Sequence, residues 1–225
     1  MKAAVCREFG APLQVEEVQL ADPGPGEVEV KLGATAVCHS DISYAEGSWG
    51  GDLPAVYGHE AAGVVSRTGA GVTSVSAGDR VVVTLIRSCG SCDGCRQGQP
   101  VTCDATFPLD ERSPLSDAAG RPIAHDMRTA AFAEYALVES TQLVRIPPDL
   151  PLDVASLLAC GVITGYGGVA NTAKVAPGSH VAVLGCGGVG LNGVQAAQLA
   201  GTESVSSSGS TRRSRRSGPA RRCET

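Results

Sequence analysis

Four cysteines within fifteen residues constrain this chain more than any other feature. They are interleaved with glycines, which let the loop fold around a small ion, and they follow the spacing Cys89-x2-Cys92-x2-Cys95-x7-Cys103. Four thiolates at this spacing suit tetrahedral zinc, and a closed shell of four leaves no open coordination position. We therefore expect a structural zinc ion that contributes to folding and takes no part in chemistry.

Two other interpretations of these cysteines stay open. Cysteines at two-residue gaps also hold iron–sulfur clusters, although no proline follows Cys103 and no second cluster loop is present. Disulfides would need an oxidising compartment. Met1 to Gly10 alternates like a strand and has no features of a signal peptide, so we expect a cytoplasmic protein and prefer zinc.

The first 150 residues are typical of an irregular, mostly β domain. Short apolar or alternating segments are separated by turns rich in glycine and proline. They predict strands over Met1–Cys6, Glu27–Ala36, Ala61–Thr68, Arg80–Leu85 and Phe132–Val138. Residues 104–130 are expected to form a long loop.

The pattern changes after residue 150 to one typical of an α/β domain. It predicts helices over Val154–Leu158 and Gly165–Ala173, a buried parallel strand over His180–Leu184, and a helix over Leu191–Leu199. The uncharged stretch Val154–Ala173 is long enough to cross a bilayer, but glycines and polar residues dilute it. No membrane span is expected.

A glycine motif, Gly185-x-Gly187-x2-Gly190, joins the predicted strand to the last helix. In this context the first glycine permits a tight turn, the second admits a pyrophosphate close to the backbone, and the third lets the helix pack on the strand. The helix N-terminus would then offer N–H groups to phosphate. The alternative is a βα turn that merely packs tightly.

Three further groups of residues contain candidate metal ligands: Cys38-His39-Ser40-Asp41, Gly58-His59-Glu60 and Ala159-Cys160-Gly161. Taken singly, each has an ordinary explanation. A lone buried cysteine is usually a small core residue, and a lone histidine is usually a satisfied polar group. Only their combination points to a site.

That combination resembles the zinc-containing medium-chain alcohol dehydrogenases over residues 1–201. The segment Gly58-His59-Glu60-x2-Gly63-x5-Gly69-x2-Val72 resembles the zinc signature of the family, and the four-cysteine loop follows it. The sequence CGVITGYGGVANTAKV from Cys160 resembles the branch with glutathione-dependent (class III type) formaldehyde dehydrogenases. The resemblance implies an α/β plus β fold, with a GroES-like zinc-binding catalytic domain over 1–150 and the start of a Rossmann NAD(P)-binding domain over 151–201.

The resemblance also implies roles for individual residues. Cys38, His59 and Cys160 would bind a catalytic zinc with an open fourth position, which gives two zinc ions per chain. Asp41 would hydrogen-bond to His59, Glu60 would lie beside the metal, and Ser40 would receive the alcohol proton. The alternatives are a capping or solvated acid for Asp41 and ordinary turn polarity for Ser40. A relay histidine of the best-known members is replaced by Ser43.

Cofactor contacts follow from the same resemblance. His39 would contact the pyrophosphate, unless it is a surface histidine. The remaining cofactor-binding residues would be Thr164, Gly185, Gly187, Gly188, Val189 and Gly190. No carboxylate lies near Ser208, where an acid that binds the adenosine ribose is expected. NAD and NADP both stay open, with NAD preferred.

Residues 202–225 differ from the rest of the chain. They contain six Arg and seven Ser but no Leu, Ile, Met or aromatic residue, and we expect them to be disordered. An out-of-frame reading of coding sequence would explain them, and a basic tail for an acidic partner is the alternative. Since 35 residues follow Gly190, we expect the Rossmann domain to be incomplete, in a chain truncated at its C-terminus.

The expected function is hydride transfer between NAD(P) and a primary or secondary alcohol, or a hydroxymethyl-thiol adduct. The alternative is a non-catalytic zinc-binding remnant of such an enzyme, and the activity of this chain by itself is open. Expected partners are small alcohols or aldehydes, without nucleic acid or membrane. Full-length relatives are expected to be homodimers or homotetramers.

Overall fold

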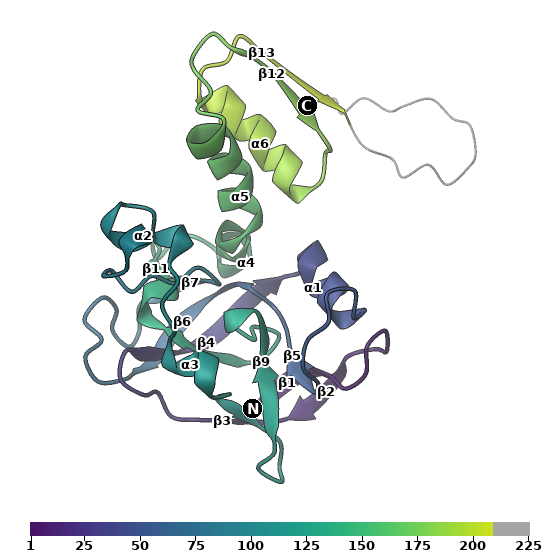
Figure 1. Ribbon diagram of the computed structural model, residues 1–225, viewed down its shortest axis with the longest axis vertical. Helices are drawn as coiled ribbons and strands as arrows, with labels where there is room; N and C mark the ends of the chain where they lie inside the picture. Colours follow the sequence, from purple (N-terminus) through teal and green to yellow (C-terminus); the bar gives the residue numbers. More distant parts are fainter. Residues whose placement is uncertain (209–225) are drawn as a thin grey trace. The chain divides into compact units, whose positions relative to one another are not determined.

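The computed structural model describes residues 1–208 and divides into two compact units, Met1–Ala159 and a second that begins at Cys160 (Figure 1). The sequence placed the domain boundary after residue 150. Helix α4 (Leu152–Ser156) and the following 3-10 turn η4 (Leu157–Ala159) belong to the first unit instead. Ala155 and Ala159 are buried there against Ala62 and Val82 of the first unit, which explains the later boundary.

Two sheets form the framework of the first unit among the described residues. The larger has the order β2-β1-β5-β9-β8-β3, and the smaller has the order β10-β4-β6-β7-β11. The strands of the larger sheet are β1 (Lys2–Cys6), β2 (Gln14–Glu17), β3 (Gln19–Leu20), β5 (Ala55–Val56), β8 (Leu115–Ser116) and β9 (Pro122–His125). Those of the smaller are β4 (Glu27–Ala36), β6 (Glu60–Thr68), β7 (Arg80–Thr84), β10 (Tyr135–Glu139) and β11 (Leu143–Arg145). All five predicted strands are present, within three residues at their ends.

Short helices and turns connect these strands. They are α1 (His39–Ala45), α2 (Asp93–Arg96), α3 (Pro108–Glu111) and the 3-10 turns η1 (Pro100–Thr102), η2 (Asp126–Arg128) and η3 (Ser140–Gln142). The prediction of a long loop over 104–130 was wrong, because α3, β8, β9 and η2 lie within it. Leu115 and Ile123 pair across β8 and β9 and are buried, but strands this short leave no readable alternation in the sequence.

Valine side chains on one face of the five-stranded sheet form the largest core. Val28, Val30, Val65, Val81 and Val138 are almost fully buried there, as alternation along paired strands requires. The pairing of β4 with β6 contains two register shifts. Beside one of them, a Cβ added to Gly63 would lie 2.2 Å from the carbonyl oxygen of Lys31, so only glycine fits at this close approach.

The second unit is built from a strand, a helix and a second parallel strand. Its elements are α5 (Gly161–Gly167), a π-helical turn η5 (Gly168–Thr172), β12 (His180–Leu184), α6 (Gly188–Leu199) and β13 (Ser204–Ser208). β12 and β13 pair in parallel from His180–Ser204 to Leu184–Ser208. The predicted strand and the helix after the glycine motif are confirmed.

The expected disorder after residue 201 was wrong for Ser204–Ser208. These residues form β13, and Val205 packs with Val181 against a small core on α6 that contains Ala196 and Ala197. One apolar side chain and a complete set of backbone pairs are sufficient for a strand in this position. Residues 209–225 lie outside the described part of the chain.

No single helix among residues 1–208 has both the length and the apolar composition to cross a membrane. The segments 152–159 and 161–172 meet those criteria only when they are taken together as a broken pair.

Burial of His125 makes the stability of the first unit depend on pH. Its Nε2 atom is buried and has no hydrogen-bond partner among the described residues. Burial lowers the pKa of His125 to about 4, and the nearby positive charge of Arg87 acts in the same direction. The folded protein therefore keeps a neutral imidazole at pH values where the unfolded chain binds a proton.

We expect the free energy of unfolding to fall as the pH is lowered from 6.5 to about 4. Across this window His125 should lower the free energy of unfolding by about 3 kcal/mol. The decrease should level off below the pKa of His125 in the folded protein. Denaturant unfolding at both ends of the window measures it, with His125→Gln as the matched variant. The difference between the two proteins removes contributions from other groups. Equal losses in both proteins would contradict the prediction.

Candidate functional site

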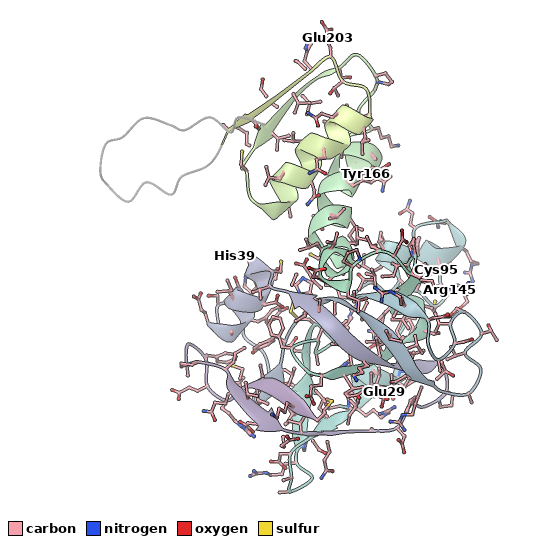
Figure 2. The ribbon with its side chains drawn as sticks, turned by 180° about the vertical axis from the view of Figure 1, so that it is seen from behind. Glu29, His39, Cys95, Arg145, Tyr166 and Glu203 are labelled. Carbon is pink, nitrogen blue, oxygen red and sulfur yellow. The ribbon has the colours of Figure 1, made fainter. Side chains whose placement is uncertain are left out.

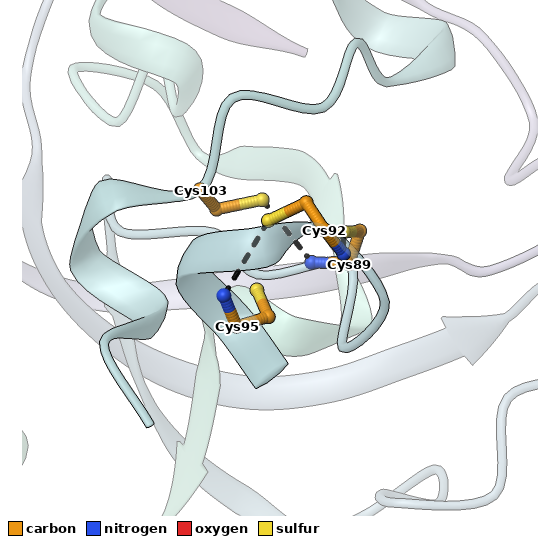
Figure 3. A group of neighbouring side chains, drawn as sticks. All are labelled: Cys89, Cys92, Cys95 and Cys103. Atoms are coloured by element: carbon orange, nitrogen blue, oxygen red, sulfur yellow. Dashed lines mark hydrogen bonds between the residues drawn. The ribbon is translucent and has the colours of Figure 1, made fainter. Parts of the chain in front are cut away.

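The four predicted cysteines of the loop lie together. The Sγ atoms of Cys89, Cys92, Cys95 and Cys103 are all within 4.8 Å of one another, and each side chain is half-buried (Figure 3). No disulfide joins cysteines in the described part of the chain. Cys92 caps the short helix α2, so the helix orients two of the thiols.

Backbone N–H groups point at these sulfur atoms. The N–H of Cys89 donates to Sγ of Cys103 at 3.3 Å, and the N–H of Cys92 donates to Sγ of Cys89 at 3.2 Å. The backbone N–H and the hydroxyl of Ser91, with the N–H of Cys92, lower the pKa of the Cys89 thiol to about 6. The N–H of Cys95 lowers the pKa of Cys92, but desolvation and the neighbouring thiols raise it to about 11. Four sulfur atoms this close cannot all be thiolates unless a cation lies among them.

A buried arginine holds the base of this loop. Arg87 is largely buried, and its Nη2 atom lies 2.5 Å from Oδ1 of Asp110. Its guanidinium carbon also lies 4.4 Å from the centre of the Phe107 ring. The segment after Cys103 is thereby tied to the end of β7, which fixes both ends of the loop.

A second group of donors lies within the first unit. Ligand atoms of Cys38, His59 and Glu60 are within 4.8 Å of one another. They converge because β4 and β6 are antiparallel and Ala36 pairs with Glu60. Cys38 follows the end of β4 and caps α1, while His59 precedes the start of β6. The strand register therefore brings together residues that are 21 positions apart in the sequence.

Asp41 orients this group from the first turn of α1. The carboxylate is 2 % exposed, and its Oδ1 atom lies 3.0 Å from Nδ1 of His59, as the resemblance implied. The same carboxylate accepts from the N–H of Cys38 at 2.7 Å and from the N–H of Gly58 at 3.2 Å. Because Nδ1 of His59 faces Asp41, Nε2 is the nitrogen left to bind a ligand.

The other predicted residues for this site are Ser40, His39 and Cys160. The thiol of Cys38 donates to Oγ of Ser40 at 3.7 Å. His39 is exposed at the start of α1, in a different part of the first unit from Cys95 (Figure 2). Cys160 is the first residue of the second unit and directly follows Ala159, whose carbonyl accepts a hydrogen bond from Thr84 in the first unit at 3.0 Å.

The glycine motif forms the turn between β12 and α6. Gly187 precedes the first residue of α6, and Gly185 has a φ of +108°. A Cβ added to Gly190 would lie 1.7 Å from the carbonyl oxygen of Gly185, so the turn can close only over glycine. One hollow of about 630 Å³ in the second unit is lined by every predicted cofactor-binding residue of that unit: Thr164, Gly185, Gly187, Gly188, Val189 and Gly190.

Three polar residues that the sequence did not indicate hydrogen-bond close to the candidate ligands, and two of them, Thr129 and Gln142, are buried. Thr84, Thr129 and Gln142 hydrogen-bond to backbone carbonyls near Gly58 and Ala159. They belong to no recognised motif, and a threonine or glutamine with a structural partner has no distinctive neighbours in the sequence. No pattern could have identified them.

Comparison with known proteins decides the family. The sequence profile described as the alcohol dehydrogenase GroES-like domain matches residues 24–148, more than half of the chain. The chain belongs to the alcohol dehydrogenase family. The predicted fold class is therefore confirmed: a mostly-β GroES-like domain is followed by part of a Rossmann-like domain.

Solved alcohol dehydrogenases share this arrangement. A zinc-binding domain protein of this family from Burkholderia ambifaria is 38% identical, with a TM-score of 0.86; the match covers 92% of this chain and 58% of that one. Benzyl alcohol dehydrogenase from Acinetobacter calcoaceticus is 32% identical, with a TM-score of 0.81 and coverages of 92% and 57%. A cinnamyl alcohol dehydrogenase from Sorghum bicolor is 29% identical, with a TM-score of 0.74 and the same coverages. The chain thus spans less than three fifths of the length of these relatives.

Proposed function

We propose that this chain carries two zinc ions and the metal-binding catalytic part of a zinc-dependent, NAD(P)-linked alcohol dehydrogenase. One ion would be structural and held by Cys89, Cys92, Cys95 and Cys103. The other would be catalytic and held by Cys38, His59 and Cys160. The observation that carries the proposal is the buried carboxylate of Asp41, which hydrogen-bonds to His59 and to the backbone of Cys38.

The donor sets fit zinc at both places. Four thiolates make a closed tetrahedral shell, which suits a structural ion. Cys38 and His59 offer a thiolate and an imidazole within 4.8 Å. Cys160 follows Ala159 in the chain and, by the family resemblance, supplies the third donor. Three protein ligands leave one position open, as a catalytic zinc requires. Glu60 offers a carboxylate in the same group and is a reserve ligand.

Zinc, when bound, stabilises the alkoxide of an alcohol near neutral pH, and the nicotinamide accepts the hydride. The residues of the chain position the reactants. Asp41 holds His59 in one tautomer and one orientation. Ser40 would receive the hydroxyl proton of the alcohol, and the distance of 3.7 Å between its Oγ atom and Sγ of Cys38 supports this role. His39 would contact the pyrophosphate of the cofactor.

The second unit would bind the cofactor through the turn before α6. Gly187, Gly188 and Gly190 would admit the pyrophosphate to the N-terminus of the helix. Thr164 and Val189 line the same hollow and would lie beside the nicotinamide. NAD is preferred over NADP, and the similar acetophenone reductase from Geotrichum candidum was solved in complex with NAD.

The substrate we propose is a small primary or secondary alcohol, or the corresponding aldehyde or ketone. Two of the similar structures are named for benzyl and cinnamyl alcohol. The sequence from Cys160 adds a hydroxymethyl-thiol adduct as a further candidate, through the formaldehyde dehydrogenase branch. A cytoplasmic location is part of the proposal, and full-length relatives are expected to be homodimers or homotetramers.

The alternative function is zinc binding without hydride transfer. Zinc content per chain, NAD(H) binding and alcohol-dependent absorbance at the nicotinamide band separate the two. Two zinc ions with cofactor binding and alcohol-dependent reduction support the dehydrogenase. Two zinc ions without either would support the alternative, and fewer than two would contradict at least one of the two metal assignments.

Replacing Asp41 by alanine should weaken the catalytic zinc site without disturbing the four-cysteine site. Loss of an acid that orients a ligand histidine lowers metal affinity by about 10- to 100-fold. Competition with a chromophoric chelator measures this for each ion. The control is Asp79→Ala, which removes a carboxylate that accepts from the N–H of Ser76 in a partly exposed turn. Equal affinities for Asp41→Ala and the control would refute the role of Asp41.

A further inference from the structure

We propose that Thr129, Gln142 and Thr84 are positioning residues that hold the backbone beside two ligands of the catalytic zinc. The inference rests on the proposed function, because it takes His59 and Cys160 as ligands. None of the three residues belongs to either group of candidate metal ligands. Thr129 and Thr84 each donate to the carbonyl of the residue that precedes a ligand, and Gln142 connects the two through the carbonyls of Arg128 and Thr84.

Thr129 acts on the carbonyl before His59. Its side chain is 0 % exposed, and its hydroxyl donates to the carbonyl oxygen of Gly58 at 2.6 Å. The N–H of Ala131 donates to the same oxygen at 3.0 Å. Both lone pairs of this carbonyl are therefore engaged, and the peptide group that leads into His59 is held from one side by a single segment.

That segment has an unusual backbone. Met127, Arg128 and Ala130 have φ angles of 52°, 62° and 46°, in the left-handed region that residues with a side chain rarely adopt. The N–H groups of Thr129 and Ala130 both donate to the carbonyl of Asp126. Such a conformation persists only where the surroundings determine it, and it is commonly found next to functional sites.

Gln142 makes the contact that holds this segment in its left-handed conformation. Its side chain is 0 % exposed, and Nε2 donates to the carbonyl of Arg128 at 3.0 Å and to the carbonyl of Thr84 at 2.8 Å. Its Oε1 accepts from the N–H of Glu139 at 3.0 Å. One amide therefore ties the left-handed segment to the end of β7.

Thr84 carries the connection to the other ligand. Its hydroxyl donates to the carbonyl of Ala159 at 3.0 Å, and Cys160 is the next residue. A continuous path of buried and half-buried contacts thus runs from the carbonyl before His59 to the carbonyl before Cys160. Its steps are Gly58, Thr129 and Arg128, then Gln142, then Thr84 and Ala159. Metal sites tolerate ligand displacements of only about 0.5 Å, so a network that fixes both peptides would govern how tightly the ion is held.

Pairs of variants test this network in the full-length chain. Thr129→Val removes the hydroxyl at similar volume, and Thr129→Ser restores it. Thr84→Val and Thr84→Ser form a second pair, at a less buried position. Ser156→Ala is the control, since it deletes a buried hydroxyl of the first unit that donates to the carbonyl of Asp153 at 2.8 Å. Release of each zinc to a chromophoric chelator is followed, together with the visible spectrum after cobalt substitution.

We expect both valine variants to release the catalytic zinc about 10-fold faster or more, and to shift the cobalt spectrum. The serine variants and Ser156→Ala should behave like the unmodified chain, and the four-cysteine zinc should be retained in all. If Thr129→Val does not fold, the comparison of Thr84→Val with Thr84→Ser tests the network instead. Unchanged release from valine variants of a chain that binds two zinc ions would overturn the network alone. A chain that binds no zinc at Cys38 and His59 would overturn the proposed function instead.

Discussion

A chain in which Cys103 is replaced by serine should contain one zinc ion fewer and should lose the fold of the loop over residues 89–103. The physical reason lies in the loop itself. Apart from α2 and η1 it has no regular structure, and its cysteines are half-buried among one another without an apolar core. In such a segment the free energy of metal binding contributes directly to folding, and it reaches about 10 kcal/mol or more in small zinc domains.

Zinc analysis, chelator titration and hydrogen exchange over residues 89–103 measure this effect. The loop should exchange like an unfolded segment, whereas β4, β6 and β7 should keep their protection. Cys6→Ala is the matched control, because Cys6 is a buried cysteine in β1 that belongs to neither group of ligands. If Cys103→Ser kept two zinc ions and a protected loop, the loop would not be a zinc site.

The two proposed metal sites differ in how well the sequence could predict them. The four-cysteine site is local, since the spacing of Cys89 to Cys103 already places the donors in one loop. The second site depends on strand register. The strands that carry it could be recognised. The pairing of Ala36 with Glu60, which brings Cys38 to His59, cannot be predicted from the sequence of either strand. The family resemblance, and not periodicity, supplied that site.

Other differences between sequence and structure have the same origin. β8 and β13 are held by pairing with neighbours, and their own residues give weak signals: β13 has the sequence SVSSS. The left-handed segment around Arg128 contains no glycine, so the sequence gives no indication of its positive φ angles. In the proposed network Gln142 acts through the backbone carbonyls that it contacts, and carbonyls are common to all residues. Tertiary pairing therefore decided these elements, whereas turns and apolar strands could be predicted.

Replacing His59 by alanine should remove the catalytic zinc and abolish any alcohol-dependent reduction of NAD(P) that the chain supports. The imidazole is 1 % exposed and is held by Asp41, so its loss leaves the buried carboxylate with its backbone donors alone and the metal with two protein ligands. Two ligands hold zinc far more weakly than three. Since zinc contributes several kcal/mol to stabilising the alkoxide, activity should fall by about 1000-fold or more.

The measurement has two parts, so that loss of metal is separated from loss of activity. Zinc content should fall from two ions to one, and the remaining ion should be the slowly released one of the four-cysteine loop. His180→Ala is the control, because His180 is an exposed histidine in β12 that contacts Ser204 and Glu203 and lies in neither group of ligands. It should retain both ions. A His59→Ala chain with two tightly bound zinc ions would show that the second ion is held elsewhere, and the catalytic assignment of Cys38, His59 and Cys160 would fail.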